Sequence, residues 1–289
     1  MPLASSGPIV RHRFHDRCNY FCFVADSYFA IVDETETGGR YLAGPGTVGP
    51  WDERLQHGGP PTALAVGTAE RAVRAETGRA DLVARRIAAD FVGPVPVAEV
   101  AADSRVVRAA RSAALVEVTL SSDGRPCLAA RIWFVRTADT ASVAAAEAEP
   151  VGPEGSSSGL DYQFGYGASL QWRFVHGRMA EPGPAAAWVR PMLPIVAGRD
   201  MSGLSRAALI ADSASGISAE LDWSVWSFLN VDLDVHLARP FRGDWLLMEA
   251  ATQLGPDGSA LARSTLSDVY GVMGAGLQTL VVAPLRRAQ

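Results

Sequence analysis

Three polar residues in the second half of the chain have side chains that could do chemistry together. Asp212 lies among small residues of a helical pattern, Asn230 lies near the start of a strand-like segment, and Gln278 interrupts an apolar strand. A carboxylate can orient and deprotonate a water molecule, whereas neutral amides can hold that water or a substrate carbonyl without competing for the proton. The set is typical of hydrolysis without a serine or cysteine nucleophile. Each residue alone is equally well explained as a surface residue or a satisfied core hydrogen bond.

The segments that would position these residues form an internal repeat. A helical pattern over residues 60–76 precedes a meander of strand-like segments, and the same order returns after a helical pattern over residues 204–221. The bend at residues 91–94 aligns with the bend at residues 237–240, an offset of 146 residues (240 minus 94). One offset shared by bends, helices and final strands indicates a repeat. The strand-like segments are residues 87–91, 115–120 and 127–135, and then 228–237, 246–254, 260–270 and 277–283.

At this offset each polar residue has an apolar partner in the first half. The aligned pairs are Asp212 with Val66, Asn230 with Ala84, and Gln278 with Ile132. A polar group that replaces a core residue needs a hydrogen-bonding partner if it is buried. We therefore expect Val66 and Ile132 to be buried. The three polar side chains should converge within about 8 Å, which leaves room for one water and a substrate.

The repeat predicts an α+β chain made of two similar halves. In each half a helix packs against an antiparallel sheet, and such a sheet best hides its apolar face and its edge by pairing with a twin. The predicted parts are a leader over residues 1–27, an N-terminal domain over residues 28–137 and a C-terminal domain over residues 160–289. Residues 138–159 are rich in Ala, Glu, Ser, Gly and Pro without apolar periodicity, and they are predicted to be a linker.

Composition and charge exclude several classes of function. The chain has 289 residues, of which 48% are hydrophobic and 20% charged, and its net charge of -5 opposes binding to nucleic acid. The three cysteines have no framework spacing, which favours a reducing, cytoplasmic location. The apolar run near the N-terminus is interrupted by Asp26 and predicts neither a signal peptide nor a membrane span.

A metal site is conceivable only near the N-terminus, where His12, His15, Cys18 and Cys22 occur together. Only two residues separate the His pair from the Cys pair, whereas structural zinc sites place a longer loop there. The two histidines are also closer in sequence than is usual for zinc ligands. We therefore expect neither a metal nor an organic cofactor.

Short motifs in both halves resemble those of the TesB-like acyl-CoA thioesterase family. They are HGGPP at residues 57–61, ADSA at residues 211–214, NVDL at residues 230–233 leading to Arg239 and Pro240, and GLQTLVV at residues 276–282. The resemblance covers residues 28–285 and implies two fused hotdog domains, a double hotdog, acting on an acyl-CoA substrate. It implies that Asp212 activates water and that Asn230 and Gln278 complete the catalytic set. Asn230 stands where many relatives have a hydroxyl residue.

His57, Gly58 and Gly59 are the candidate substrate-binding residues. They open the first helix, where free backbone N–H groups can polarise a carbonyl group or bind a phosphate. The glycines are equally explained by close packing, and a local hydrogen bond explains His57 better than a role as a base. Arg239 is expected at the end of a strand, either solvated or near the phosphates of CoA.

Other functions compete with thioester hydrolysis. A protein of this fold could bind acyl thioesters or lipids without turnover. An enoyl hydratase would use Asp52 and His57, whose spacing fits, but the residues between them lack the Asn and Pro of the hydratase motif. A serine hydrolase is disfavoured because the Gly-x-Ser-x-Gly match at residues 155–159 lies in the predicted linker. An exposed sheet edge predicts a homodimer.

Overall fold

The computed structural model describes most of the chain. Outside the described residues lie 1–25, 145–148, 150, 156–163, 180 and 286–289. The zinc candidates near the N-terminus and nearly all of the predicted leader therefore lie outside the described residues, as does the serine of the Gly-x-Ser-x-Gly match. No helix among the described residues is long and apolar enough to cross a membrane.

Each half contains one helical stretch and an antiparallel set of strands. The first half consists of β1 (Phe29–Glu34), β2 (Gly38–Ala43), η1 (Pro45–Thr47), α2 (Gly59–Thr77), β3 (Leu82–Asp90), β4 (Glu99–Ala109), β5 (Ala113–Ser122) and β6 (Arg125–Arg136). After the short turn η2 (Ala141–Val143), the second half consists of α3 (Gly165–Ala168), β7 (Leu170–His176), β8 (Ala185–Pro191), α4 (Gly203–Ala211), α5 (Ala214–Ile217), β9 (Trp226–Asn230), β10 (Asp232–Leu237), β11 (Leu246–Leu254), β12 (Ser259–Asp268) and β13 (Gly271–Pro284).

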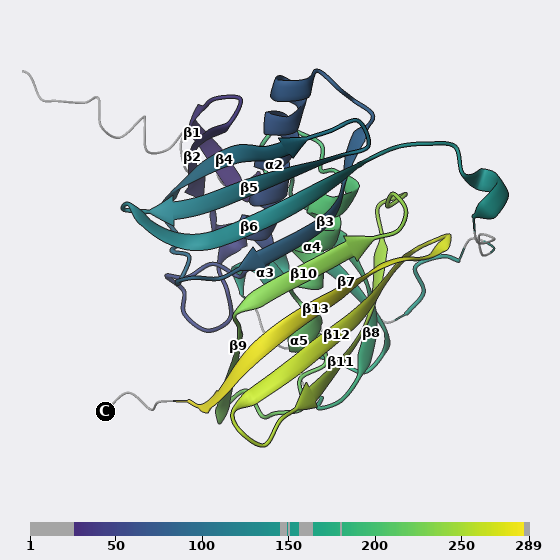
Figure 1. Ribbon diagram of the computed structural model, residues 1–289. Coiled ribbons are helices and arrows are strands. Elements are labelled where there is room, and N and C mark those ends of the chain that lie inside the picture. The colour runs from purple at the N-terminus through teal and green to yellow at the C-terminus, as the bar shows by residue number, and fades with distance from the viewer. Residues whose placement is uncertain (1–25, 145–148, 150, 156–163, 180, 286–289) are drawn as a thin grey trace, which may run out of the picture.

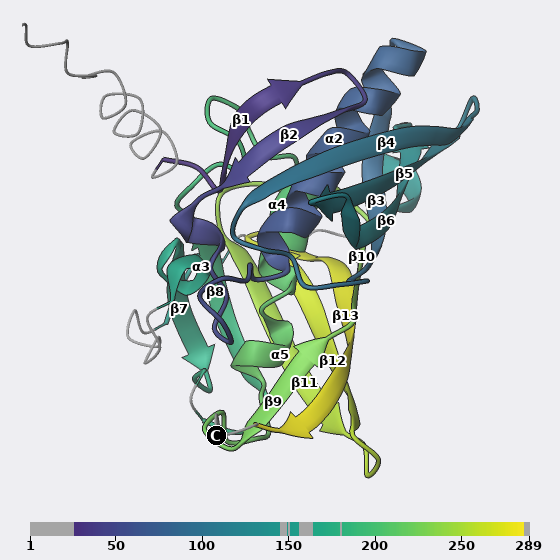
Figure 2. The same cartoon turned by 90° about the vertical axis from the view of Figure 1, so that its left-hand side faces the viewer.

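The strands of both halves form one sheet in the order β1-β2-β4-β5-β6-β3-β10-β13-β12-β11-β8-β7, with β9 also paired to β13 (Figure 1). The halves join at the centre of the sheet, where β3 and β10 pair antiparallel with Ile87 opposite Val235. The sheet curves around α2 and α4 (Figure 2). The larger of two buried apolar clusters contains residues of both halves, so the two halves pack as one unit.

The predicted repeat is confirmed element by element. A shift of 146 residues moves the bounds of β5 onto those of β12, and moves Arg125, the first residue of β6, onto Gly271, the first residue of β13. Val66 and Ile132 are fully buried, and Ala84 is 3% exposed. The positions aligned with the three polar residues are therefore core positions, as predicted.

Several predicted boundaries were wrong. The helix expected over residues 204–221 is interrupted after Ala211 and resumes at Ala214, so Asp212 is the C-cap residue of α4 rather than a mid-helix residue. The strand expected over residues 228–237 is divided into β9 and β10 at Val231. The strands β1, β2, β4, β7 and β8 were not predicted at all.

Candidate active site

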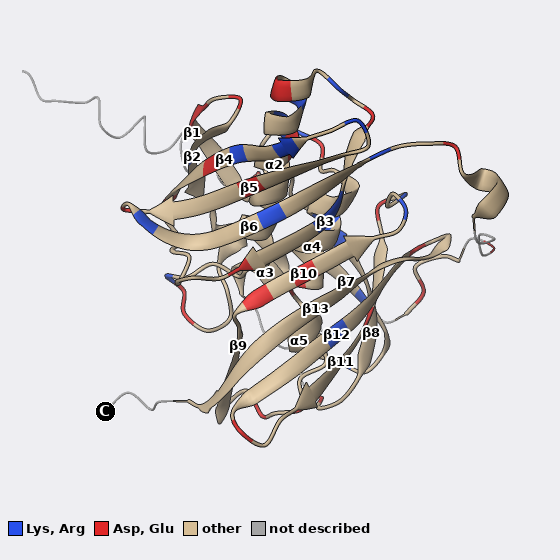
Figure 3. Cartoon of the chain, in the orientation of Figure 1, with Lys and Arg blue, Asp and Glu red and all other residues tan. Residues whose placement is uncertain are grey.

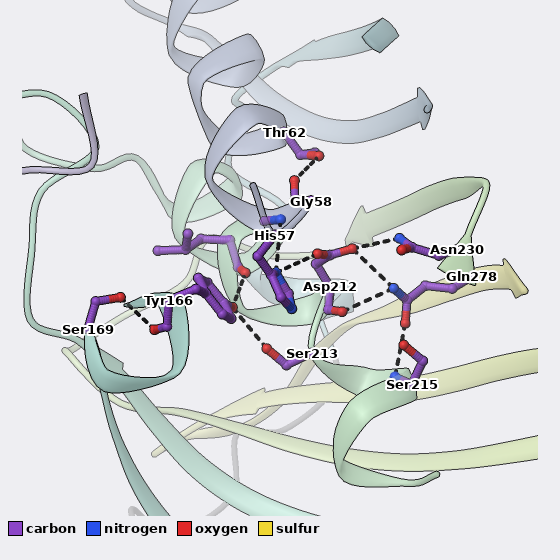
Figure 4. A network of polar contacts seen from close by, with 12 residues as sticks. His57, Gly58, Thr62, Tyr166, Ser169, Asp212, Ser213, Ser215, Asn230 and Gln278 are labelled. Carbon is purple, nitrogen blue, oxygen red and sulfur yellow. Dashed lines mark hydrogen bonds and ion pairs between the residues drawn. The ribbon is translucent and has the colours of Figure 1, made fainter. Parts of the chain in front are cut away.

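The Asp212 carboxylate lies where the C-terminal end of α4 meets the first turn of α2, and its side chain is only 2% exposed. Three side chains contact it (Figure 4). Oδ1 accepts hydrogen bonds from Asn230 Nδ2 at 2.7 Å and from Gln278 Nε2 at 3.1 Å. Oδ2 lies 2.7 Å from His57 Nδ1. The structure thus brings the three predicted catalytic residues together and adds His57 to them.

Gln278 occupies the interruption between α4 and α5. Its Nε2 also donates to the main-chain oxygen of Asp212 at 3.1 Å, and its Oε1 accepts from the main-chain N–H of Ser215 at 3.1 Å. In a continuous helix the Asp212 carbonyl and the Ser215 N–H would bond to backbone groups one turn away. Where a helix is interrupted in the interior, these groups need other hydrogen-bond partners. The carboxamide of Gln278 therefore satisfies the broken helix and holds Asp212 in place at the same time.

Asn230 points inward because the strand changes phase directly after it. Phe228 and Leu233 are both buried, although residues five positions apart in a regular strand lie on opposite faces of the sheet. The irregularity is held by the Asp232 carboxylate, which accepts from Thr279 N at 2.5 Å and Thr279 Oγ1 at 3.1 Å. A β-bulge of this kind redirects a side chain, here toward Asp212.

The His57 ring is fixed from its other side. It stacks on Tyr166 with ring centroids 3.8 Å apart and an interplanar angle of 10°. The Tyr166 hydroxyl donates to the Leu209 carbonyl at 2.6 Å and lies 2.9 Å from Ser213 Oγ. Burial raises the pKa of Tyr166 well above its usual value, so the hydroxyl remains a neutral donor. Tyr166 was not predicted, because it belongs to no motif.

Gly58 and Gly59 allow α2 to approach this site closely. A Cβ atom on Gly59 would lie 2.3 Å from the Leu209 carbonyl oxygen, and one on Gly58 would lie 2.9 Å from Asp212 Oδ2 and 2.5 Å from the Phe91 ring. Close packing, one of the two expected reasons for these glycines, therefore applies to both. Gly58 also borders the cavity described next, and Gly59 does not.

A cavity of about 480 Å³ opens in front of His57, Gly58, Asp212 and Asn230. Its further walls are mainly apolar and aromatic. They include Trp51, Leu55, Phe91, Pro94, Val95, Trp223, Phe228 and Val281. Trp51 stacks on Trp223 with centroids 5.2 Å apart, and Phe228 meets both rings edge-on at 5.0 Å. Gln278 is 1% exposed and is not among the lining residues, so it acts on Asp212 rather than on the contents of the cavity.

Two other charged residues have structural partners. Asp52 bonds to Arg54 Nη2 at 2.6 Å and not to His57, and the hydrogen bonds from Arg54 lower the pKa of Asp52 to about 2. Asp52 and His57 both line the cavity, but the Asp52 carboxylate is engaged by Arg54, which does not favour the enoyl hydratase alternative. Arg239 lies just beyond the end of β10, as expected. Its guanidinium was expected in solvent or near phosphate, but it forms two 2.6 Å bonds with the buried Asp268 carboxylate.

No group of three or more His, Cys, Asp or Glu residues in the described part of the chain could hold a metal ion. The chemistry available at the Asp212 cluster is that of one buried carboxylate, one imidazole and two carboxamides. Such a set can activate water and polarise a carbonyl group beside an apolar chain.

Two helices wrapped by a sheet that joins twin halves define a double hotdog, as predicted. Residues 47–135 match the N-terminal domain of acyl-CoA thioesterases, and residues 140–282 match their C-terminal domain. The chain therefore belongs to the acyl-CoA thioesterase family and is a thioester hydrolase. A comparison with curated proteins finds no match.

Solved structures share the fold at low sequence identity. An acyl-CoA thioesterase II of Mycobacterium marinum is 14% identical with a TM-score of 0.66, and 93% of this chain and 99% of that chain are covered. A TesB protein of Mycobacterium avium subspecies paratuberculosis is 15% identical with a TM-score of 0.63, covering 92% and 99%. A hotdog protein of Alicyclobacillus acidocaldarius is 13% identical with a TM-score of 0.70, covering 92% and 98%.

Proposed function

We propose that this protein hydrolyses acyl-CoA thioesters with a water molecule activated at Asp212, and that Asn230 and Gln278 hold the carboxylate in position. The observation that supports this most directly is a carboxylate only 2% exposed that receives hydrogen bonds from both amides and borders an apolar cavity. A buried charge is costly unless it is paired, so a carboxylate kept in this place indicates a chemical use for it.

The cavity suits an acyl chain, and the start of α2 suits the thioester carbonyl group. The helix has 19 residues, so the positive end of its dipole favours a developing oxyanion beside Gly58. Pro60 and Pro61 have no N–H group, and the Gly59 N–H faces His57 Nδ1 rather than the cavity, which leaves Gly58 as the main-chain donor at this turn. In the proposed complex the carbonyl oxygen faces this turn, the acyl chain lies against Trp51, Trp223 and Phe228, and CoA leaves toward solvent.

The test is a panel of acyl-CoA thioesters of increasing chain length and branching. The CoA released by hydrolysis is measured with a thiol reagent. We expect turnover of at least one member and saturation by that substrate. An assay of binding to the same panel runs in parallel. If every member binds and none is hydrolysed, the hydrolase proposal fails, and the protein is an acyl-thioester binding protein on the same fold.

We further propose that the protein is a cytoplasmic homodimer in which the outer faces of two second-half sheets meet. This face exposes Leu261 and Leu277, whereas the outer face of the first half carries ion pairs such as Arg105 with Glu117. Charged positions are more frequent along β4, β5 and β6 than along β12 and β13 (Figure 3). Exposed apolar patches of this kind are typical of interfaces.

The charges beside this face fit a second copy of the chain. Asp234, which also pairs with Arg86, and Arg263 lie on either side of Leu277 in the sheet register. A two-fold axis parallel to the strands near Leu277 would place each acid opposite the other copy's arginine. Light scattering after size-exclusion chromatography should give a dimer for the wild type and a monomer for Leu277→Asp. A wild-type monomer at micromolar concentration would refute the proposal.

A further inference from the structure

We infer that His57, through its Nε2 atom, is the group that takes the proton from the hydrolytic water, and that Asp212 acts on the water through His57. This inference rests on the proposed function and assigns roles within the same site. It replaces the sequence-based expectation that His57 makes only a local hydrogen bond.

The first argument concerns the lone pairs of Asp212. Its Oδ1 atom already accepts from Asn230 and Gln278, and its Oδ2 atom contacts His57. A carboxylate oxygen offers about two acceptor sites, so only one direction on Oδ2 remains open. A general base must be within hydrogen-bond reach of the proton that it removes, directly or through one water. The side chain of His57 is 14% exposed against 2% for Asp212, so the cavity reaches the imidazole more than the carboxylate.

The second argument concerns the tautomer of His57. Two groups approach Nδ1, which are Asp212 Oδ2 at 2.7 Å and the Gly59 N–H at 3.3 Å. A hydrogen bond to a carboxylate is the shorter and stronger kind, so we assign the proton to Nδ1, which donates to Asp212. Nε2 then carries a free lone pair. Among the residues that the structure describes, none forms a hydrogen bond with Nε2.

The third argument concerns the rigidity of the pair. Tyr166 stacks flat on the imidazole and is itself tied to Leu209 and Ser213, so the ring cannot turn away from Asp212. Gln278 and Asn230 fix the carboxylate from the opposite side. An imidazole held by a buried carboxylate at one nitrogen is prepared to accept a proton at the other, because the carboxylate stabilises the imidazolium that forms.

The reaction then proceeds in two proton transfers. Nε2 removes a proton from water while the water oxygen forms a bond to the thioester carbonyl carbon, whose π electrons move to the carbonyl oxygen. When the carbonyl re-forms, the C–S bond breaks with its electron pair on sulfur, and the Nε2 proton passes to the departing thiolate. The products are a carboxylic acid and CoA, and His57 returns to its neutral form.

The test compares His57→Ala with His236→Ala, a matched control because His236 is exposed on β10. With the best substrate of the panel, we expect kcat of His57→Ala to fall by ~10² to 10⁴-fold with little change in KM. Free imidazole in the buffer should restore part of kcat, which a purely structural role would not allow. The control should keep wild-type kcat and gain nothing from imidazole.

A second variant keeps the inference testable if the alanine variant does not fold. His57→Gln retains a side-chain donor for Asp212 but has no group that can accept a proton, so it should be as inactive as His57→Ala. A folded His57→Gln or His57→Ala protein with wild-type kcat would overturn the inference, and so would a loss confined to KM or one that imidazole does not relieve. If the wild type hydrolyses no thioester, the proposed function itself has failed.

Discussion

The two halves of the chain share one backbone plan and differ in a few side chains. Where the second half has Asp212, Asn230 and Gln278, the first half has Val66, Ala84 and Ile132, all buried. The first half nevertheless keeps a cavity of about 440 Å³ at the related place. The two cavities share equivalent lining positions. With the offset of 146 residues, Ile195, Val196, Met201 and Ser202 of this cavity correspond to Gly49, Pro50, Leu55 and Gln56 of the other. The fold therefore repeats this cavity among the described residues, and the side chains proposed to activate water occur at only one of the two places.

The first-half cavity has a different electrostatic character. Glu70, whose counterpart in the active half is Gly216, points into a space that also contains Arg71, Arg74 and Arg199. Burial raises the pKa of Glu70 to about 7. Arg71 and Arg199 both pair with Glu34, so much of the positive charge is used within the protein.

The largest expected effect is that of Asp212→Asn, which keeps the size of the side chain and removes its charge. Turnover should fall by ~10² to 10⁴-fold, because the hydrolytic water loses the negative charge that drives its deprotonation. The measurement is kcat for the best thioester, with CoA affinity as the control that should change little. Wild-type hydrolysis by this variant would show that the asymmetry between the halves has no catalytic meaning.

Gln278→Ala should have a smaller effect, on the order of 10- to 100-fold in kcat, because the base remains while one positioning contact is lost. The variant also leaves Ser215 N–H and the Asp212 carbonyl without their partner, which should cost about 1–3 kcal/mol of stability. Steady-state kinetics and urea unfolding measure the two effects. An unchanged kcat would mean that Gln278 serves only the helix interruption.

Val66→Ala alters the position that corresponds to Asp212 in the inactive half. It should lower the free energy of unfolding by about 1–2 kcal/mol through lost packing, and activity per folded molecule should stay the same. Denaturant unfolding and kcat of the same preparation provide the comparison. A loss of turnover as large as that of Asp212→Asn would contradict the division of labour between the halves.

The smallest expected effect is a pH dependence that belongs to the first half alone. The pKa of Glu70 in the folded protein, about 7, is above its ordinary value of 4.5, so the folded state binds more protons than the unfolded state between these values. The contribution of Glu70 to stability is therefore present below pH 4.5 and is lost as the pH rises to 7. Relative to Glu70→Gln, the wild type should lose on the order of 1 kcal/mol across this window. The measurement is the free energy of unfolding at several pH values. If it changes with pH equally in the wild type and in Glu70→Gln, this account is wrong.

The repeat and the polar trio could be predicted from the sequence because both are patterns in the order of residues. The contact between His57 and Asp212 could not, because it joins positions 155 residues apart (212 minus 57) in different halves. The interruption of the second helix escaped prediction for a related reason. It depends on the Gln278 carboxamide, which supplies the missing backbone partners from a distant strand.

The missed strands have a local explanation. β4 combines charged residues with small ones, and many of its side chains are exposed, so it lacks the apolar alternation that marks a strand. β1 and β7 lie at the two edges of the sheet. β7 does show apolar alternation, with Leu170, Trp172 and Phe174 buried, so its sequence contained a signal that the prediction did not use. Arg239 was misjudged because Asp268, its partner, lies 29 residues further along the chain with no motif to connect them.

The pairing of β3 with β10 joins two copies of one backbone plan within a single chain. When a site is formed by two identical chains, each substitution occurs in both copies, and a change that abolishes one site abolishes both. A single chain that carries both copies is free of this constraint, because position 66 and position 212 can change separately. One half can serve burial and the other chemistry, and the first-half positions that correspond to the proposed catalytic ones are free to stabilise the fold.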